Sequence, residues 1–437
     1  MRLQPIVTPR FALAAVTLVL ALAQPAPAQS AYETDLEFAL RELPKKCATL
    51  IASKDIDWKK VEKEFAKAAK DVESDQEHWV LLTRLLARLN DGHAEVHTTD
   101  KTANLTWPQP EGGAPVGCGM FWCRSGKKIL VKTVYGDAVK SGIEAGWEVV
   151  KVDDVPVQKW LAARVAKLRD TQSFSTDHQA FFTACHWGLA EPAGSTVGYE
   201  FKDEKGSKRK KNITFSRGNP VPWGPAVFPA ELKGSDDVRF TLLPSGFGYV
   251  HVRRCKGDLP RQIDEALTVV GSAKGLILDF RANGGGGFDH DDFMGRFVPK
   301  GTTLSFGKSY ASTGASPYGG PIVVIVDAGC RSAGETGAGI FKEDGRAFMI
   351  GESLTAGMSA QKTEIELPSG LFKLYVSTGS NKGRFNGGKG IEGIGVVPHE
   401  IVEYDAKDLA AGVDTLIRRA EALLAKFPQN DVPYRAE

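Results

Sequence analysis

The sequence predicts a multidomain α/β protein with a helical N-terminal segment, a β-rich middle segment and an α/β core. Three observations support this fold class. The chain has 437 residues, of which 42% are hydrophobic, enough for two or three separate cores. Short alternating strands with turn signals fill the middle of the chain. After residue 245, apolar strands alternate with helical stretches, a pattern typical of parallel strand pairs.

The first 28 residues have the pattern of a secretory signal peptide. Arg2 and Arg10 precede an apolar stretch over residues 11–23, which is followed by Pro-Ala-Pro-Ala over 25–28. A charged start, a short apolar stretch and an Ala-x-Ala site define such a peptide. We therefore expect cleavage after Ala28 and a periplasmic or secreted protein. No later segment is long and apolar enough for a transmembrane anchor.

Residues 29–106 are expected to form an N-terminal helical domain. Apolar residues recur at helical spacing in three stretches, 36–43, 57–68 and 78–89. The third ends in Asn-Asp-Gly-His over 90–93, a stop signal followed by an alternating strand. A Pro- and Gly-rich linker over 107–115 marks the domain boundary.

Residues 113–218 are expected to form a β-rich domain. It contains one predicted helix, His178–Leu189, and the predicted strands Ile129–Val134, Glu148–Val152, Gly198–Phe201 and Lys211–Phe215. The basic cluster Lys208–Lys211 is interpreted as a solvated hairpin loop. The formal charge of +2 includes Arg2 and Arg10, so the remaining chain is balanced and nucleic-acid binding is not expected.

Residues 219–404 are expected to form the α/β core, with a C-terminal helix and tail over 405–437. The pattern predicts a strand over 248–253, a helix over 259–270, a strand over 275–280 and a buried strand over 321–326. The last segment, Ala406–Ala425, is amphipathic. The six cysteines match no zinc-binding spacing, so no metal or other cofactor is expected, and their pairing is not legible.

Ser332 lies among small residues, between the predicted strand over 321–326 and the start of a predicted helix. One interpretation is a capping serine in a tight turn. The other is a nucleophile at the head of a helix, where N–H groups can stabilise an oxyanion. A glycine-rich turn over 284–287 permits close backbone approach, although a plain turn explains it as well. Considered alone, His93 is a structural histidine and Glu392 an exposed turn residue.

Three motifs together resemble the C-terminal-processing (tail-specific) serine peptidases, whose relatives include the tricorn protease core and interphotoreceptor retinoid-binding protein. They are "VVIVDAGCRSAGETGAGIFKEDGRAFMIGE", "LILDFRANGGG" and "GIEGIGVVPH". The resemblance extends over about residues 31–404 and implies a core of the ClpP/crotonase-like type. It also implies a Ser332 acyl-enzyme, with an oxyanion hole formed by the N–H of Ala333 and that of Gly285 or Gly286.

The β-rich segment resembles the PDZ domain of this family. Gly117, Cys118, Gly119 and Met120 are similar to the loop that holds a peptide carboxylate, and "DAVKSGIEAGWEVVKVDDVPV" is similar to the segment after it. The resemblance implies binding of an extended peptide at an open strand edge. The alternative is a rigid cap without a peptide ligand.

The chain departs from the tail-specific pattern at the general base. Gly357 stands where the family has its lysine, while Gln361 matches a family glutamine and is a supporting candidate. Lys362 is adjacent, but neighbouring strand residues face opposite ways. The stretch "LNDGHAEVH" resembles the tricorn branch, which implies that His93 is the base and that Glu392 completes the site. Gly92 replaces the serine that precedes the histidine in the tricorn protease.

The predicted function is that of an exported serine endopeptidase acting on protein or peptide substrates. Three alternatives stay open. The chain could be a ligand- or peptide-binding protein on the same scaffold, an adaptor that works through the PDZ-like domain, or a hydrolase of non-peptide esters or amides. The oligomeric state is not legible from the sequence.

Overall fold

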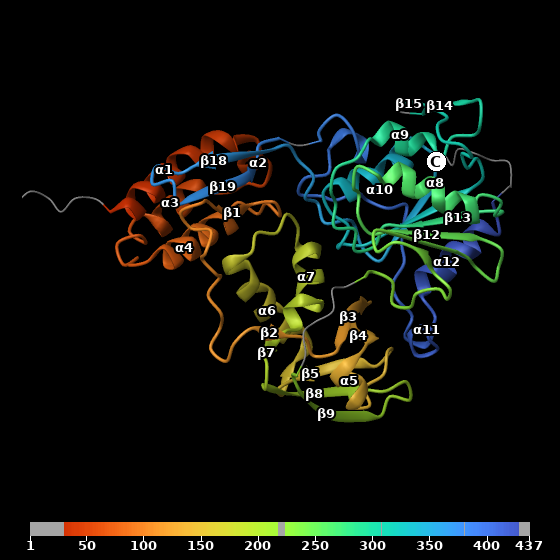
Figure 1. Cartoon of the computed structure of the whole chain (residues 1–437). Helices are drawn as coiled ribbons and strands as arrows, with labels where there is room; N and C mark the ends of the chain where they lie inside the picture. The colour runs from red at the N-terminus through yellow and green to blue at the C-terminus, as the bar shows by residue number, and fades with distance from the viewer. Residues whose placement is uncertain (1–29, 217–222, 307, 380, 428–437) are drawn as a thin grey trace, which may run out of the picture.

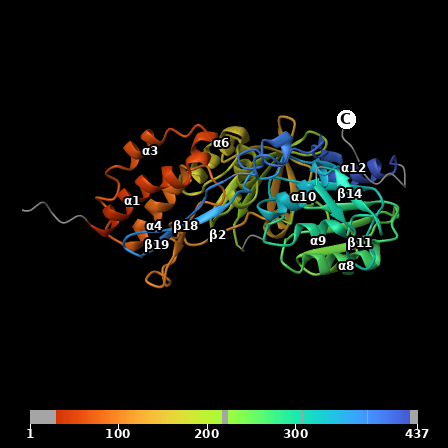
Figure 2. The same cartoon turned by 90° about the horizontal axis from the view of Figure 1, so that it is seen from above.

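The computed structural model describes residues 30–216, 223–306, 308–379 and 381–427. The predicted signal peptide and the last ten residues of the predicted tail lie outside them. The molecule is elongated, with the N-terminal helices at one end and the α/β core at the other (Figures 1 and 2). Among the helices that the structure describes, none has both the length and the apolar character needed to cross a bilayer.

The N-terminal helices pack on a small sheet built from two distant parts of the chain. The helices are α1 (Ala31–Lys46), α2 (Ala48–Ser53), α3 (Trp58–Phe65) and α4 (Asp75–Ala87). The sheet has the order β1–β19–β18, from β1 (Glu95–Thr98), β18 (Lys362–Glu366) and β19 (Phe372–Ser377). Leu82 and Leu85 of α4 share one buried cluster with Phe372 and Leu374 of β19. Two strands from within the predicted 219–404 core therefore complete the core of the N-terminal region.

The middle region is a twisted antiparallel sheet with three helices. Its sheet has the order β3–β4–β5–β8–β9, and β6 also pairs with β5. The strands are β2 (Pro115–Val116), β3 (Met120–Ser125), β4 (Lys128–Val134), β5 (Glu148–Val152), β6 (Val155–Pro156), β7 (Glu191–Pro192), β8 (Thr196–Lys202) and β9 (Lys208–Thr214). The helices are α5 (Gly136–Lys140), α6 (Val157–Thr171) and α7 (Asp177–Cys185), the last followed by the 3-10 turn η1 (Trp187–Leu189).

The α/β core is a seven-stranded sheet in the order β10–β11–β12–β13–β16–β17–β20. The strands are β10 (Lys233–Gly234), β11 (Val238–Leu242), β12 (Gly248–Val252), β13 (Leu276–Asp279), β16 (Ile322–Val326), β17 (Phe348–Gly351) and β20 (Glu400–Ile401). From β12 to β20 all pairs are parallel, whereas β10 and β11 are antiparallel. A small hairpin, β14 (Thr303–Phe306) and β15 (Lys308–Ala311), and the turn η2 (Asn386–Gly388) lie outside this sheet.

Helices cover both faces of the parallel sheet, which explains its continuous apolar strands. Leu276 and Leu278 of β13 belong to the cluster on the side of α8 (Leu259–Val270), α9 (His290–Gly295) and α10 (Ala333–Glu343). Ile277, between them, packs on the opposite side with α12 (Thr415–Leu424). Figure 2 shows α12 and α8 on opposite sides of the core. Because β13 and β16 are parallel neighbours, their carboxyl ends lie side by side at the same end of the sheet.

Two local features differ from the sequence-based expectation. The basic cluster over 208–211 lies in strand β9 and not in a loop. The turn forms directly before the cluster, where the Asp203 carboxylate accepts the N–H groups of Lys205 and Ser207. The amphipathic segment after Ala406 is two helices, α11 (Ala406–Ala410) and α12, since Gly412 adopts a φ of +69° that breaks the helix.

Candidate active site

Ser332 lies between strand β16 and helix α10, in a strained backbone conformation. Its φ is +56° and its ψ is −128°, a backbone conformation that residues other than glycine rarely adopt. Such strain persists only where the surrounding contacts hold it. The Ser332 N–H donates to Glu335 Oε2 at 3.1 Å, and helix α10 begins at the next residue. The hydroxyl is thereby held at the head of a helix.

A buried aspartate joins the Ser332 turn to the glycine-rich turn after β13. Asp327 Oδ1 accepts the N–H of Ala282 at 2.8 Å and those of Gly329 and Cys330 at 2.9 and 3.0 Å. Ala282 lies two residues before the glycine-rich turn, so one carboxylate holds both the Ser332 turn and the segment that leads into the glycines. Burial, and then the nearby Glu352 carboxylate, raises the pKa of Asp327 to about 7. The spacing of motifs did not single out Asp327.

The glycine-rich turn lies directly against Ser332. A Cβ on Gly285 would lie 2.8 Å from the Ser332 Cβ, so only glycine fits there. The Gly285 N–H donates to Asn283 Oδ1 at 2.8 Å and is therefore occupied. The N–H groups of Gly286 and Ala333 make no hydrogen bond within the described residues. Of the three predicted oxyanion-hole residues, Gly286 and Ala333 are thus the ones with free donors.

His93 approaches Ser332 from the N-terminal domain. Its Nε2 lies 3.2 Å from Ser332 Oγ, although the two residues are 239 positions apart. The imidazole is 9% exposed. Burial, followed by the charge of Lys362, lowers its pKa to about 4. The ring is therefore neutral, and able to accept a proton, across the neutral pH range.

The loop that carries His93 is held by the middle domain and by strand β19. The N–H groups of Asp91 and Gly92 donate to Ser173 Oγ at 2.8 Å and Ser175 Oγ at 2.9 Å. The Asp91 carboxylate accepts the His93 N–H at 3.0 Å and both the N–H and hydroxyl of Ser377 at 2.8 and 3.0 Å. Asp91 therefore orients the loop from inside the protein.

Glu392 lies in a buried cluster with His93 and Asp91. Its Oε1 accepts hydrogen bonds from Lys54 Nζ at 2.7 Å and Ser175 Oγ at 2.8 Å. Its Oε2 and His93 Nδ1 are both buried and lack a partner within the described residues. Ligand-type atoms of Asp91, His93 and Glu392 lie within 4.8 Å of one another. A metal ion would meet the Lys54 ammonium beside Glu392, which disfavours a metal at this position. Asp91 Oδ1 lies 4.0 Å from His93 Nδ1, and no Glu392–His93 hydrogen bond forms within the described residues.

Comparison with known proteins finds a family that resembles the core. Residues 246–402 match peptidase family S41. The matched region contains Ser332 and Glu392. A chloroplastic C-terminal processing peptidase from Tetradesmus obliquus is 25% identical over 309 residues, covering 66% of this chain and 61% of that protein. The chain thus spans less than two thirds of that relative's length.

Solved structures share the fold over nearly the whole chain. Mature CPAF superposes with a TM-score of 0.62 at 14% sequence identity, covering 90% of this chain and 97% of that one. A putative peptidase from Parabacteroides merdae superposes with a TM-score of 0.53 at 16% identity, covering 92% and 100%. At such identities the likeness concerns the fold alone.

The α/β core has no room for a lysine at the position where the tail-specific pattern has one. Gly357 has a φ of +79°, and a Cβ there would lie 2.6 Å from Thr176 Cγ2. A side chain on Gly92 would likewise meet Gln179 Nε2 and Met358 Cβ at 2.9 Å. Gln361 is exposed, and its side chain makes no hydrogen bond within the described residues. The structure therefore does not bring Gln361 to Ser332.

A second buried carboxylate, Glu335, supports the turn from the side of α10. It accepts four hydrogen bonds, from Thr355 Oγ1 and from the N–H groups of Gly357, Met358 and Ser332, at 2.6 to 3.1 Å. Burial raises its pKa to about 8, against the effect of these donors. Glu335 is the glutamate of the Ser-Ala-x-Glu motif over 332–335, so this motif could have identified it from the sequence.

The four predicted carboxylate-loop residues, 117–120, are buried at the start of β3. Gly119 has a φ of +85°, and a Cβ there would overlap the Tyr135 carbonyl. A cavity of about 320 Å³ is lined by β3 and α7, and it reaches Ala328 and Glu352 of the α/β core.

Proposed function

We propose that the protein is a serine endopeptidase in which Ser332 is the nucleophile and His93 the general base. The observation that carries this proposal is the 3.2 Å separation of His93 Nε2 and Ser332 Oγ. A serine hydroxyl needs an adjacent base to attack a carbonyl, and a separation within reach of a hydrogen bond supplies it. The closed environment of Gly357 argues against a lysine base at that position.

The reaction follows from the donors around Ser332. His93 accepts the Ser332 proton at Nε2 as the oxygen attacks the peptide carbonyl. The N–H groups of Gly286 and Ala333 bind the resulting oxyanion. The imidazolium then gives its proton to the leaving amine, which breaks the peptide bond and leaves the acyl-enzyme. Water, deprotonated by the same imidazole, releases the acid product and restores Ser332.

Glu392 stabilises the imidazolium in this mechanism. Its unpartnered Oε2 and the unpartnered His93 Nδ1 are complementary once Nδ1 carries the proton. A carboxylate in that position fixes the tautomer that leaves Nε2 free to accept. Lys54 and Ser175, both bonded to Oε1, keep the carboxylate oriented.

The direct test is cleavage of an unfolded casein substrate by the mature protein. We expect fragments from the natural protein and loss of cleavage in both Ser332→Ala and His93→Ala. Ser245→Ala is the matched control, because its hydroxyl bonds to Glu421 on an exposed surface. Activity retained in a folded His93→Ala variant would mean that another group is the base. A natural protein that cuts nothing would favour the binding-protein alternative.

We also propose that the middle domain is PDZ-like and that substrates are cut near their C-termini. Its support is the sequence resemblance of residues 117–120 to a carboxylate loop and the cavity between β3 and α7. The processing role is known for the Tetradesmus relative by its name only. A peptide with a free C-terminus should bind the Ser332→Ala protein more tightly than its amidated form, and equal binding would contradict this role.

Export is the last part of the proposal. It depends on the pattern of residues 1–28, which lie outside the described residues. We expect the N-terminus of the exported protein to begin at Gln29, which N-terminal sequencing would determine. An intact Met1 in the active protein would contradict the signal peptide.

A further inference from the structure

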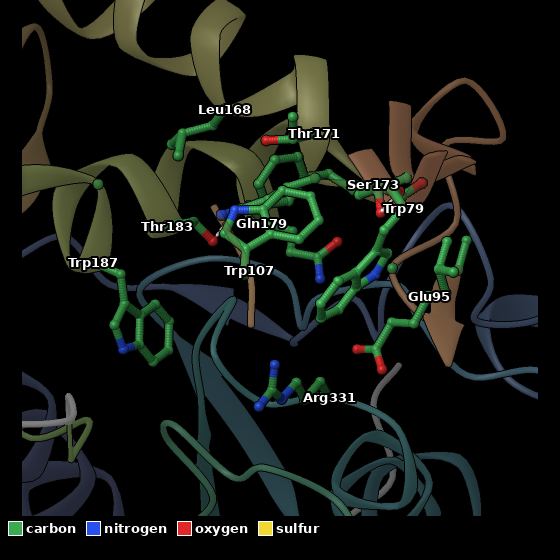
Figure 3. Close-up of a pocket in the computed structure, with 17 residues that line it drawn as sticks. Trp79, Glu95, Trp107, Leu168, Thr171, Ser173, Gln179, Thr183, Trp187 and Arg331 are labelled. Atoms are coloured by element: carbon green, nitrogen blue, oxygen red, sulfur yellow. Dashed lines mark hydrogen bonds between the residues drawn. The ribbon is translucent and has the colours of Figure 1, made fainter. Parts of the chain in front are cut away.

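A large cavity opens beside the catalytic pair. It has a volume of about 650 Å³ and lies between the N-terminal domain, helices α6 and α7, and the Ser332 turn. Its walls include Gly92 and Arg331, the immediate neighbours of His93 and Ser332. Figure 3 shows side chains from all three parts around one space. A substrate bound at Ser332 would therefore extend directly into it.

Three tryptophans form much of the apolar wall. Trp79 and Trp107 meet edge to face, with ring centroids 5.3 Å apart. Trp187, from the turn after α7, is 40% exposed. Figure 3 shows Trp187 apart from the other two rings. Trp79 and Trp107 are half-buried, and tryptophans that line a shared cavity are typical of a surface that binds a large apolar group.

A cation, Arg331, lies on the opposite wall (Figure 3), within electrostatic reach of Arg254 and Glu95. Arg331 is exposed, and its guanidinium makes no hydrogen bond or ion pair within the described residues. Glu95 faces the same cavity, but its carboxylate lies 3.7 Å from His97 Nε2 and does not reach ion-pair distance to Arg331. An unpaired guanidinium presents a fork of donors that fits a carboxylate.

Strand β1 provides a path along the cavity. It is an edge strand, paired with β19 on one side only. Ala94, Glu95 and Val96, at its start, line the cavity just after His93. An extended peptide that pairs with such an edge gains main-chain hydrogen bonds, while its alternate side chains enter adjoining pockets.

We propose that this cavity selects the substrate: a bulky apolar side chain packs against the three tryptophans, and a nearby carboxylate binds Arg331. The inference rests on the proposed peptidase function, since it needs a peptide at Ser332. The carboxylate comes from an acidic side chain close to the cleaved bond or from the C-terminus of the substrate itself. Both present the same chemistry to Arg331, and they differ in what amidation of the peptide does.

The test measures binding to the Ser332→Ala protein, which separates recognition from catalysis. Four fluorescein-labelled decapeptides are compared by anisotropy. The first contains phenylalanine and an internal aspartate, and its C-terminus is amidated. The second contains asparagine in place of the aspartate, and its C-terminus is free. The third has asparagine and an amidated end, and the fourth is the first with alanine in place of phenylalanine. If the first peptide binds more tightly than the third, the carboxylate that binds Arg331 is the aspartate side chain. If the second peptide binds more tightly than the third, that carboxylate is the C-terminus.

Variants then connect each contact to its residue. We expect Trp187→Ala and Trp79→Ala to weaken the phenylalanine peptides about tenfold or more and to leave the alanine peptide unchanged. Arg331→Gln should weaken only the peptides that carry the preferred carboxylate, about tenfold or more. Trp223→Ala is the matched control, because Trp223 stacks on Arg239 and Arg253 and does not line the cavity.

The outcomes separate the two proposals. Equal binding of all four peptides, or no effect of either Trp187→Ala or Arg331→Gln, would overturn the selection role. Trp187 is exposed, so its loss is expected to leave folding intact, which a thermal melt would verify. Selective binding by the Ser332→Ala protein, together with a natural protein that cleaves none of these peptides, would refute the peptidase function and retain the binding site.

Discussion

His93 can act as a base only when its imidazole is neutral, so its environment sets the acid limit of activity. Burial and the charges of Lys362, Arg331 and Lys54 lower its pKa from 6.5 to about 4. Lys362 is the largest of the electrostatic causes. We predict that kcat/KM stays high down to about pH 4, and that Lys362→Gln moves the acid limb to higher pH.

The size of the effect follows from the shift. Lowering the pKa from 6.5 to about 4 corresponds to about 3.4 kcal/mol against the protonated form. At pH 5, about 90% of a histidine with a pKa of 4 is neutral, against about 3% of an ordinary histidine. The natural protein should therefore be about 30-fold more active at pH 5 than it would be with an unperturbed base. Lys362 is exposed, so its share should shrink at high salt.

The assay is kcat/KM for a fluorogenic peptide between pH 3.5 and 8, at low and high salt. Lys373→Gln is the matched control, since Lys373 lies on the neighbouring strand and pairs with Glu364 and Glu366. An acid limb between pH 6 and 7 in the natural protein would refute the argument that burial dominates at His93. A limb that Lys362→Gln leaves unmoved at low salt would refute the electrostatic part.

Three further predictions concern stability and catalysis. Gly357→Lys should lower the free energy of unfolding by about 1–3 kcal/mol, measured in urea, and should not restore activity to His93→Ala, because the φ of +79° and the contact with Thr176 exclude a side chain. Lys132→Ala should cost about 3–5 kcal/mol by thermal or urea unfolding, since its buried ammonium lies 2.9 Å from Glu352. Glu392→Gln should lower kcat about 10²–10⁴-fold with little change in KM, and an unchanged kcat would exclude its role.

Local sequence signals predicted the elements that carry Ser332. The apolar run of β16 and the small residues after it are consecutive in the chain, and helix α8 has the predicted bounds Leu259–Val270. By contrast, α6 was missed, because only Val157 and Leu161 of its fifteen residues are buried and its apolar periodicity is weak. The family resemblance, rather than periodicity, singled out His93 and Glu392.

The contacts that assemble the site could not be predicted, because they join segments that are distant in the sequence. Lys54 reaches Glu392 across 338 positions, and Ser175 reaches it across 217. Such pairings depend on how three domains pack, and no local pattern encodes that packing. Strands β18 and β19 join the sheet of the N-terminal region through the same kind of long-range packing. It places Ser377 against Asp91, two residues before His93.

The proposed catalytic pair is therefore divided between domains, and the middle domain contacts the loop that carries His93 and also lines the cavity. Ser173 and Ser175 bond to the His93 loop, while Leu168 and Thr171 of α6 line the cavity. A peptide in the cavity would contact the same segment that positions His93, so its binding free energy should favour the assembled site. We predict that a bound decapeptide slows amide hydrogen exchange at residues 91–93 of the Ser332→Ala protein. Unchanged exchange with saturating peptide would mean that recognition and the placement of the base are independent.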